Sequence, residues 1–205
     1  MLKAILVLFI GYLFGSISTG VLISKLAAGK DIRTEGSGNI GTTNMLRVLG
    51  RKMALFTFLG DMLKGVFGVI AGRLIFGGEL GAVLGVFGAL LGHTYPLFFG
   101  FKGGKGIATG FGSLLFVFPV QALSAIGIFF VITGLSRYVS LASIIAALAL
   151  PTLVVFIRPD QPFLLLLLYV CGVFVVWNHR SNIQRLLTHT ERKLDFNTLK
   201  KKKKA

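Results

Sequence analysis

Three short polar stretches carry the residues that could do chemistry in an otherwise apolar sequence. The first, GSGNIGTTNMLR at 36–47, has three glycines that allow the backbone to turn its amides toward a ligand. Thr42, Thr43 and Asn44 are good N-cap residues for a helix that leads to Arg47. Free amides at a helix N-terminus beside a guanidinium are typical of an anion site, most naturally one for phosphate. We therefore predict a phosphate-binding loop here, in preference to a flexible interfacial linker.

The hexapeptide GSGNIG also matches G-x-G-x-x-G, the fingerprint of dinucleotide-binding loops. That fingerprint has meaning only after a strand and at the start of a helix, within a βαβ unit. Here it follows an apolar stretch of about twenty residues, which is long enough to cross a bilayer as a helix. The sequence therefore argues against a dinucleotide site.

The second stretch, FKGGKGIAT at 101–109, is also rich in glycine. Gly103, Gly104 and Gly106 surround Lys105, so amides and an ammonium can gather around an oxyanion. It is not a Walker loop, because G-x-x-x-x-G-K-[ST] cannot be aligned on it. Its lysines could be ordinary interfacial anchors, but an anchor does not need glycines. We favour a second anion loop.

The third stretch, NHRSNIQRL at 178–186, places His179, Asn182 and Arg185 at successive helical turns. One helical face then offers a base or hydrogen-bond donor, an amide and a guanidinium. A solvated basic helix is the alternative, and this stretch alone would favour it.

Other ionisable residues lie within or beside apolar runs. Asp61 and Lys64 are three residues apart and can pair on one helical face, either for function or as an internal structural pair. His93, three residues before Pro96, is as suited to packing or capping as to function. The single Cys171 excludes an internal disulfide and is expected to be a buried structural residue.

The composition indicates which elements must position these residues. The chain has 205 residues, of which 54% are hydrophobic and 14% charged, with a mean hydropathy of +0.82. Soluble domains have about 25% charged residues. The net charge of +15 suggests nucleic acid as a partner, but basic loops that meet anionic lipid at the cytoplasmic face of a membrane protein explain it more simply. We therefore expect membrane lipids, and no nucleic acid, as partners.

Six apolar runs occupy 2–24, 53–76, 80–101, 107–136, 138–157 and 162–178. The basic loop 25–52 and the basic tail beyond Trp177 both belong inside, so the number of crossings is odd. Pro119 favours a break in the longest run, which gives seven crossings with the N terminus outside and the C terminus cytoplasmic. Five crossings would also satisfy the parity. We predict an all-α integral membrane protein with about seven transmembrane helices, some short or broken, as one domain over 1–205 with a flexible basic tail over 188–205.

Together, the three polar stretches closely resemble the three motifs of the bacterial acyl-phosphate:glycerol-3-phosphate acyltransferases, the PlsY family. The likeness extends from Tyr12 to Leu187. It implies a multi-pass enzyme of the bacterial inner membrane with its active site at the cytoplasmic face. Such an enzyme moves a fatty acyl group from acyl phosphate to the 1-position of glycerol 3-phosphate, giving lysophosphatidic acid and phosphate. Neither a cofactor nor a metal is expected.

The resemblance implies catalytic roles for Ser37, His179 and Asn182. The residues expected to contact substrate are Gly38, Asn39, Thr43, Asn44, Arg47, Lys64, Gly103, Gly104, Lys105, Gly106, Ser143 and Arg185. Relatives often have a basic residue where this chain has Asn178, but the spacing of the third motif is kept.

Two alternatives remain to be weighed. The H-x-x-x-x-D pair of acyl-CoA-dependent glycerolipid acyltransferases is absent, since Phe98, Gln184 and Leu194 stand five residues after the three histidines. The base for the acceptor hydroxyl stays open between His179, Asp61 and a phosphate oxygen of the donor. A transporter of phosphorylated metabolites is the rival function, although the halves show no internal repeat and all polar stretches lie on one side.

Overall fold

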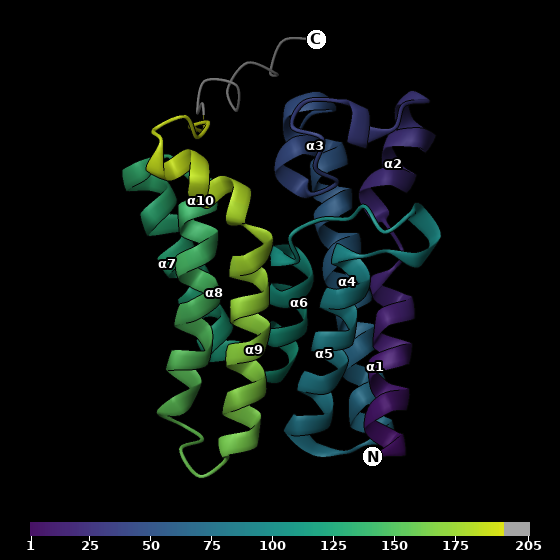
Figure 1. Cartoon of the computed structure of the whole chain (residues 1–205), viewed down its shortest axis with the longest axis vertical. Helices are drawn as coiled ribbons and strands as arrows, with labels where there is room; N and C mark the ends of the chain where they lie inside the picture. The colour runs from purple at the N-terminus through teal and green to yellow at the C-terminus, as the bar shows by residue number, and fades with distance from the viewer. Residues whose placement is uncertain (195–205) are drawn as a thin grey trace.

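The computed structural model describes residues 1–194, and this part of the chain is a bundle of helices without strands (Figure 1). In chain order the elements are α1 (Leu2–Gly15), α2 (Thr19–Ala28), the 3₁₀ turn η1 (Ile32–Thr34), α3 (Thr42–Val48), α4 (Arg51–Ile75), α5 (Gly78–Thr94), the 3₁₀ turn η2 (Leu97–Phe99), α6 (Ile107–Val117), α7 (Pro119–Ser136), α8 (Val139–Val155), α9 (Pro162–Asn178) and α10 (Arg180–Leu187). Of the tail predicted to be flexible, 195–205 lies outside the described residues.

Seven apolar segments run along the bundle, and four to five of them qualify as membrane spans, which confirms the predicted all-α membrane class. Four are long enough to span a bilayer, namely α1 with α2, α4, α5 and α7. A fifth candidate is α9 with α10, bent by 58° at their junction, and the shorter apolar helices α6 and α8 complete the set. The N terminus lies at one end of the bundle and α10 at the other, so the described chain passes along it an odd number of times (Figure 1).

The predicted break in the longest apolar run is confirmed. Helix α6 ends at Val117 and α7 begins at Pro119. Proline is tolerated in the first turn of a helix, where its missing N–H would have no partner within the helix. The single residue Phe118 therefore reverses the chain between two apolar helices.

The first apolar run, expected to be continuous over 2–24, is broken between α1 and α2. The carbonyl of Ile17 accepts a hydrogen bond from Lys64 Nζ at 2.9 Å, and Ser16 Oγ accepts one from the amide of Leu97 at 3.3 Å. Thr19 Oγ1 donates to Asp61 Oδ1 at 2.6 Å. At the break, the backbone carbonyl of Ile17 thus finds a partner on α4, as it must within a membrane, and the Ser16 and Thr19 hydroxyls bind neighbouring segments.

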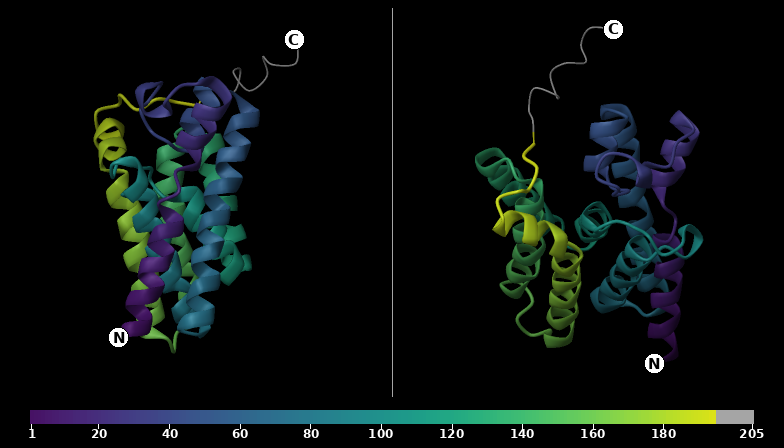
Figure 2. Two further views of the ribbon diagram at one scale, coloured as in Figure 1. Left: turned by 90° about the vertical axis from the view of Figure 1, so that its right-hand side faces the viewer. Right: turned by 45° about the horizontal axis from the view of Figure 1, so that its top comes forward.

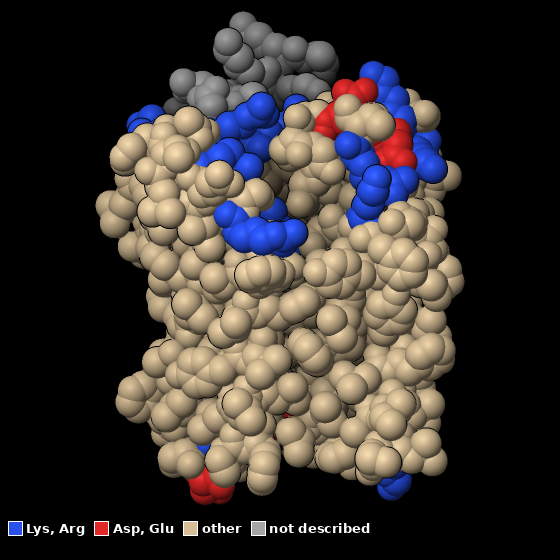
Figure 3. Space-filling view, in the orientation of Figure 1, with Lys and Arg blue, Asp and Glu red and all other residues tan. Residues whose placement is uncertain are grey.

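The helices form two groups, with α7–α10 on one side, α1–α5 on the other and α6 between them (Figures 1 and 2). Glycines allow α1, α4 and α5 to touch backbone to backbone: a Cβ on Gly15 would overlap Ala89, and one on Gly85 would overlap Gly68. Small residues permit such close approach of membrane helices. Helices α3 and α10 lie at the same end of the bundle, one in each group, and Lys and Arg side chains gather at that end (Figures 1 and 3).

Candidate active site

A polar cavity of about 650 Å³ lies at the end of the bundle that carries α3 and α10. The surface is hollowed there, with cationic side chains nearby (Figure 3). The structure brings twelve of the fifteen predicted site residues to its wall, namely Ser37, Gly38, Asn39, Thr43, Asn44, Arg47, Lys105, Gly106, Ser143, His179, Asn182 and Arg185. Lys64, Gly103 and Gly104 do not line it.

The loop before α3 forms the first wall, and Asn44 holds it together. The Asn44 amide nitrogen donates to the carbonyls of Glu35 at 3.0 Å and Asn39 at 2.8 Å, while its oxygen accepts from the amide of Ser37 at 2.9 Å. Asn44 is only 2% exposed. Its side chain therefore shapes the loop, and Gly38 completes the turn with φ +72°.

The expectation that Thr42, Thr43 or Asn44 caps α3 is wrong. The helix begins at Thr42, its N-cap is Gly41, and no side chain caps it. The Asn44 carboxamide is already used to hold the loop, and glycine takes the extended N-cap conformation without a side chain in the way. The first-turn amides of α3 are therefore left uncapped beside the cavity.

The second wall carries Lys105 at the start of α6. Its ammonium donates to Asn182 Oδ1, and burial lowers its pKa to about 8. Gly106 lines the cavity with φ +87°. Gly103 and Gly104 instead face His93: the amide of Gly104 donates to the His93 carbonyl at 3.0 Å, and a Cβ on Gly104 would overlap the His93 ring.

The third wall is the corner between α9 and α10. His179 is 2% exposed, and its Nδ1 donates to the carbonyl of Val175 at 2.8 Å, which leaves Nε2 as the acceptor nitrogen. Burial lowers the pKa of His179 to about 4, so its ring is neutral at pH 7. The corner therefore presents a neutral imidazole beside the amide of Asn182.

Glu191, which the sequence analysis did not single out, joins this corner to α8. Its carboxylate accepts hydrogen bonds from Asn182 at 2.7 Å, Arg185 at 2.7 Å and Ser140 at 2.8 Å. Burial alone would raise the pKa of Glu191, but these hydrogen bonds outweigh it and lower the pKa. Glu191 thereby fixes the amide and the guanidinium that face the cavity.

The floor of the cavity holds the buried charges of α4. Lys64 Nζ lies 2.9 Å from Asp61 Oδ1, and both side chains are almost fully buried. Asp61 and His93 line the cavity, and His93 Nδ1 lies 3.5 Å from Asp61 Oδ1. Lys64 sits behind Asp61, where it also binds the carbonyl at the break of the first span. Within residues 1–194, no group of three or more His, Cys, Asp or Glu side chains is arranged to hold a metal ion.

An apolar groove continues from the polar cavity between α6, α7, α8 and α9. It has a volume of about 190 Å³ and shares Phe58, Gly106, Ile107 and Phe129 with the cavity. Its walls are hydrophobic and include the buried thiol of Cys171, which was expected to be a structural residue. Hydropathy could not reveal this groove, because residues that face lipid and residues that line a groove are equally apolar.

Comparisons with known proteins agree on one family. Residues 5–189 match the family model described as glycerol-3-phosphate acyltransferase. The glycerol-3-phosphate acyltransferases of Geotalea daltonii and Clostridioides difficile are 46% and 40% identical to this chain, over 91% and 93% of it and 95% of each relative. The crystal structure of PlsY, an integral membrane glycerol 3-phosphate acyltransferase, in its glycerol 3-phosphate form is 38% identical with a TM-score of 0.86, covering 97% of this chain and 99% of that one. Its lysophosphatidic acid form gives a TM-score of 0.84 at 37% identity, with the same coverage.

Proposed function

Because the chain belongs to the glycerol-3-phosphate acyltransferase family, we propose that its acyl donor is acyl phosphate and that its product is lysophosphatidic acid. A fatty acyl group moves to the 1-position hydroxyl of glycerol 3-phosphate, and inorganic phosphate is released. This reaction belongs to phospholipid synthesis. Membership of the family favours this enzyme over the transporter of phosphorylated metabolites.

One observation carries the proposal: a cationic cavity opens directly into an apolar groove. The donor and the product each join a phosphate group to a fatty chain, so each needs both environments at once. We assign the fatty chain of the donor to the apolar groove between α6 and α9, with its acyl carbonyl where groove and cavity meet, near Phe58 and Ile107.

The charges of the cavity suit two phosphate groups. Its wall contains four cationic side chains, Arg47, Lys105, Arg185 and Arg192, against the carboxylates Asp61 and Glu191. The uncapped amides in the first turn of α3 add neutral donors. We assign glycerol 3-phosphate to the space between Arg47 and Lys105, with Ser37, His179, Asn182 and Ser143 offering further polar contacts.

The chemistry requires positioning more than activation, because a mixed anhydride already has a good leaving group. The acceptor hydroxyl attacks the acyl carbon, a C–O bond forms, and the bond from that carbon to the phosphate oxygen breaks. The hydroxyl proton passes to the departing phosphate, which leaves as hydrogen phosphate. The protein contributes alignment and stabilises the developing charge. Asp61 is occupied by Lys64 and Thr19, which favours the phosphate as the base.

The site's place in the cell is part of the proposal. The cationic end of the bundle faces the cytoplasm of a bacterium and the N terminus faces outward, as expected for basic loops. The chain acts as a single domain in the inner membrane. Cysteines introduced at Arg137 and Asp160 test this orientation: the first should react only from the cytoplasmic side and the second only from outside.

The decisive assay supplies purified protein in lipid nanodiscs with acyl phosphate and glycerol 3-phosphate. We expect lysophosphatidic acid and phosphate in equal amounts, and essentially no product when acyl-CoA replaces acyl phosphate. Comparable turnover with acyl-CoA would refute the proposed donor. No product, together with uptake of glycerol 3-phosphate into proteoliposomes, would restore the transporter.

A further inference from the structure

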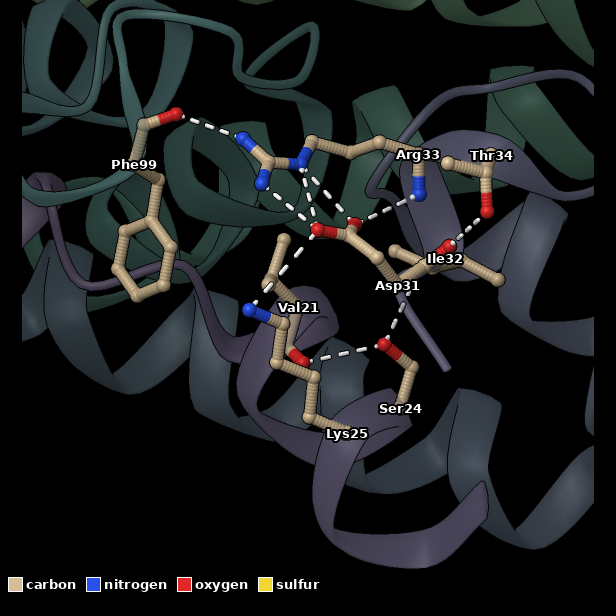
Figure 4. A network of polar contacts seen from close by, with 8 residues as sticks. All are labelled: Val21, Ser24, Lys25, Asp31, Ile32, Arg33, Thr34 and Phe99. Carbon is tan, nitrogen blue, oxygen red and sulfur yellow. Dashed lines mark hydrogen bonds and ion pairs between the residues drawn. The ribbon is translucent and has the colours of Figure 1, made fainter. Parts of the chain in front are cut away.

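Arg33 lies in the loop between α2 and α3, outside the polar cavity, and each of its three guanidinium nitrogens donates a hydrogen bond (Figure 4). Nε donates to the two carboxylate oxygens of Asp31 at 3.0 and 3.2 Å, and one terminal nitrogen donates to Asp31 Oδ2 at 2.7 Å. The other terminal nitrogen donates to the carbonyl of Phe99 at 2.6 Å. One side chain therefore ties the segment before the first glycine loop to the segment before the second.

Phe99 is held a second time, through its ring. The ring packs on a small hydrophobic cluster formed by Val21, Ile32, Ile40, Met45 and Ala54. Ile32 lies before the 36–41 loop and Ile40 lies within it, so this cluster is the core on which the first wall of the cavity rests. The ring of Phe99 is thus fixed to that core, and its carbonyl is fixed to Arg33, the residue after Ile32.

The chain from Phe99 to Lys105 needs such an anchor. Gly100 and Phe101 both have positive φ, 68° and 58°, and a phenylalanine keeps that conformation only where its surroundings impose it. Toward its other end, the segment is held by the hydrogen bond from the Gly104 amide to His93. At the end where the backbone turns, the amides of Phe99 and Phe101 donate to the Pro96 carbonyl within the same segment. The Arg33 contact is the hydrogen bond that joins this end to the loop before α3.

We propose that Arg33 is a positioning residue, which sets Lys105 at its working distance from Ser37 and Arg47 by fastening Phe99 to the core beneath the first loop. The inference rests on the proposed function, because the consequence is read in substrate binding. Arginine suits the task, since its planar fork can bind a carboxylate in two places and still reach a carbonyl, whereas the lysine ammonium is a point charge.

The test compares Arg33→Ala and Arg33→Lys with wild type in nanodiscs. We expect kcat/KM for glycerol 3-phosphate to fall about ten- to hundredfold in Arg33→Ala, chiefly through KM, because Lys105 would contact the phosphate in ground and transition states alike. Arg33→Lys should recover only a small part of this loss, although it keeps the charge.

Lys30→Ala is the matched control. It removes an equal charge from the same loop, and Lys30 pairs only with Glu35, at 3.2 Å, among the described residues. We expect its kinetics to equal those of wild type. Hydrogen–deuterium exchange supplies a readout that does not depend on activity: amides over 99–105 should exchange faster in Arg33→Ala than in wild type or Lys30→Ala.

Faster exchange at 99–105 together with a raised KM supports the inference. Unchanged exchange, or faster exchange with an unchanged KM, overturns it, and so does an equal rise in KM in Lys30→Ala, which would indicate a charge effect. If wild type makes no lysophosphatidic acid, the proposed reaction fails, while the exchange data still decide whether Arg33 holds the loop.

Discussion

In the loop before α3, Gly36, Gly38 and Gly41 all line the cavity, whereas in the 103–106 loop only Gly106 does. The first two have positive φ, which lets the loop curl around Asn44. The other glycines of the second loop press against His93. Two loops with three glycines each thus use glycine for different purposes, the first mainly for backbone conformation and the second mainly for close packing.

The cations beside the two loops differ in the same way. Within residues 1–194 the guanidinium of Arg47 has no hydrogen-bond partner, although it lines the cavity. Lys105 already donates to Asn182, which Glu191 holds in turn. The cation of the first wall is therefore open, without a partner in this part of the protein, whereas that of the second wall is interlocked in a hydrogen-bond network. A substitution in the second wall should consequently also disturb Asn182 and Glu191.

The largest effect should come from glycine substitutions that separate these two purposes. Gly104→Ala places a methyl on the His93 ring and displaces the segment that bears Lys105, so kcat/KM should fall more than about a hundredfold. Gly38→Ala meets backbone strain at φ +72°, about 1–2 kcal/mol, and a close contact of its Cβ with the Arg33 carbonyl at 3.3 Å, and it should cost much less. Steady-state kinetics of both variants checks this, with Gly127→Ala as control because its Cβ would meet open space. Equal losses in the two loops would contradict the comparison.

The next effect concerns the two cations. Arg47→Ala and Lys105→Ala should each lose about 1.5–3 kcal/mol of charge-assisted binding, or ten- to hundredfold in kcat/KM. Arg47→Lys should recover little if the guanidinium binds phosphate as a planar fork. Arg73→Ala, whose side chain lies over the Phe116 ring at 5.4 Å, is the control and should retain activity.

Double variants test the difference between the open and the interlocked wall, because only substitutions of side chains in contact should give non-additive losses in kcat/KM. The double variant Lys105→Ala/Asn182→Ala should lose less transition-state binding free energy, measured from kcat/KM, than the sum of the two single variants. The reason is that the two side chains share a hydrogen bond. Adding Asn182→Ala to Arg47→Ala should give additive losses. Additivity in both pairs would mean that the contact between Lys105 and Asn182 has no role in the reaction.

A smaller effect is expected at His179. Because its pKa of about 4 keeps the ring neutral, kcat/KM should show no acidic limb near pH 6.5. A general base typically contributes 10²–10⁴-fold, and we expect His179→Asn, which can still donate a hydrogen bond, to lose less than about a hundredfold. A drop of about four orders of magnitude, with loss of a limb present in wild type, would make His179 the base.

The smallest effect is the titration of Lys105. Burial lowers its pKa to about 8, and only the protonated form attracts phosphate, so kcat/KM should decline as the pH rises through that value. The expected loss between pH 7 and pH 8.5 is about fourfold for a group of this pKa. Lys105→Arg should remove this limb, because a guanidinium stays charged. A limb that persists in Lys105→Arg must arise from another group.

The sequence predicted most of the fold, since hydropathy identifies apolar segments and Pro119 marks the break between α6 and α7. It did not predict the break after Gly15, because no proline or charge signals it and the partners that stabilise it, such as Lys64 and Leu97, are distant in sequence. Long-range contacts of this kind are decided by packing.

The sequence predicted which residues form most of the candidate site, but it did not predict several of the contacts that these residues make. Glu191 was missed because it follows the last apolar run, in a tail whose composition is typical of a basic, solvated segment. Asn44 was identified, but its capping role was assigned from local propensity, and the structure uses its side chain to hold the preceding loop. Gly103 and Gly104 were assigned to the ligand because their contact with His93 is not visible in a linear motif.

The buried pair of α4 has a consequence for how the protein is made. An ionised side chain costs about 2.5–3.5 kcal/mol when a helix enters the bilayer. Asp61 and Lys64 neutralise each other on their own helix, and their other partners, Thr19 and Ile17, belong to a segment that is synthesised earlier. Helix α4 can therefore enter the membrane with its charges already matched. All residues of the cavity floor, His93 included, are synthesised before those of the second and third walls.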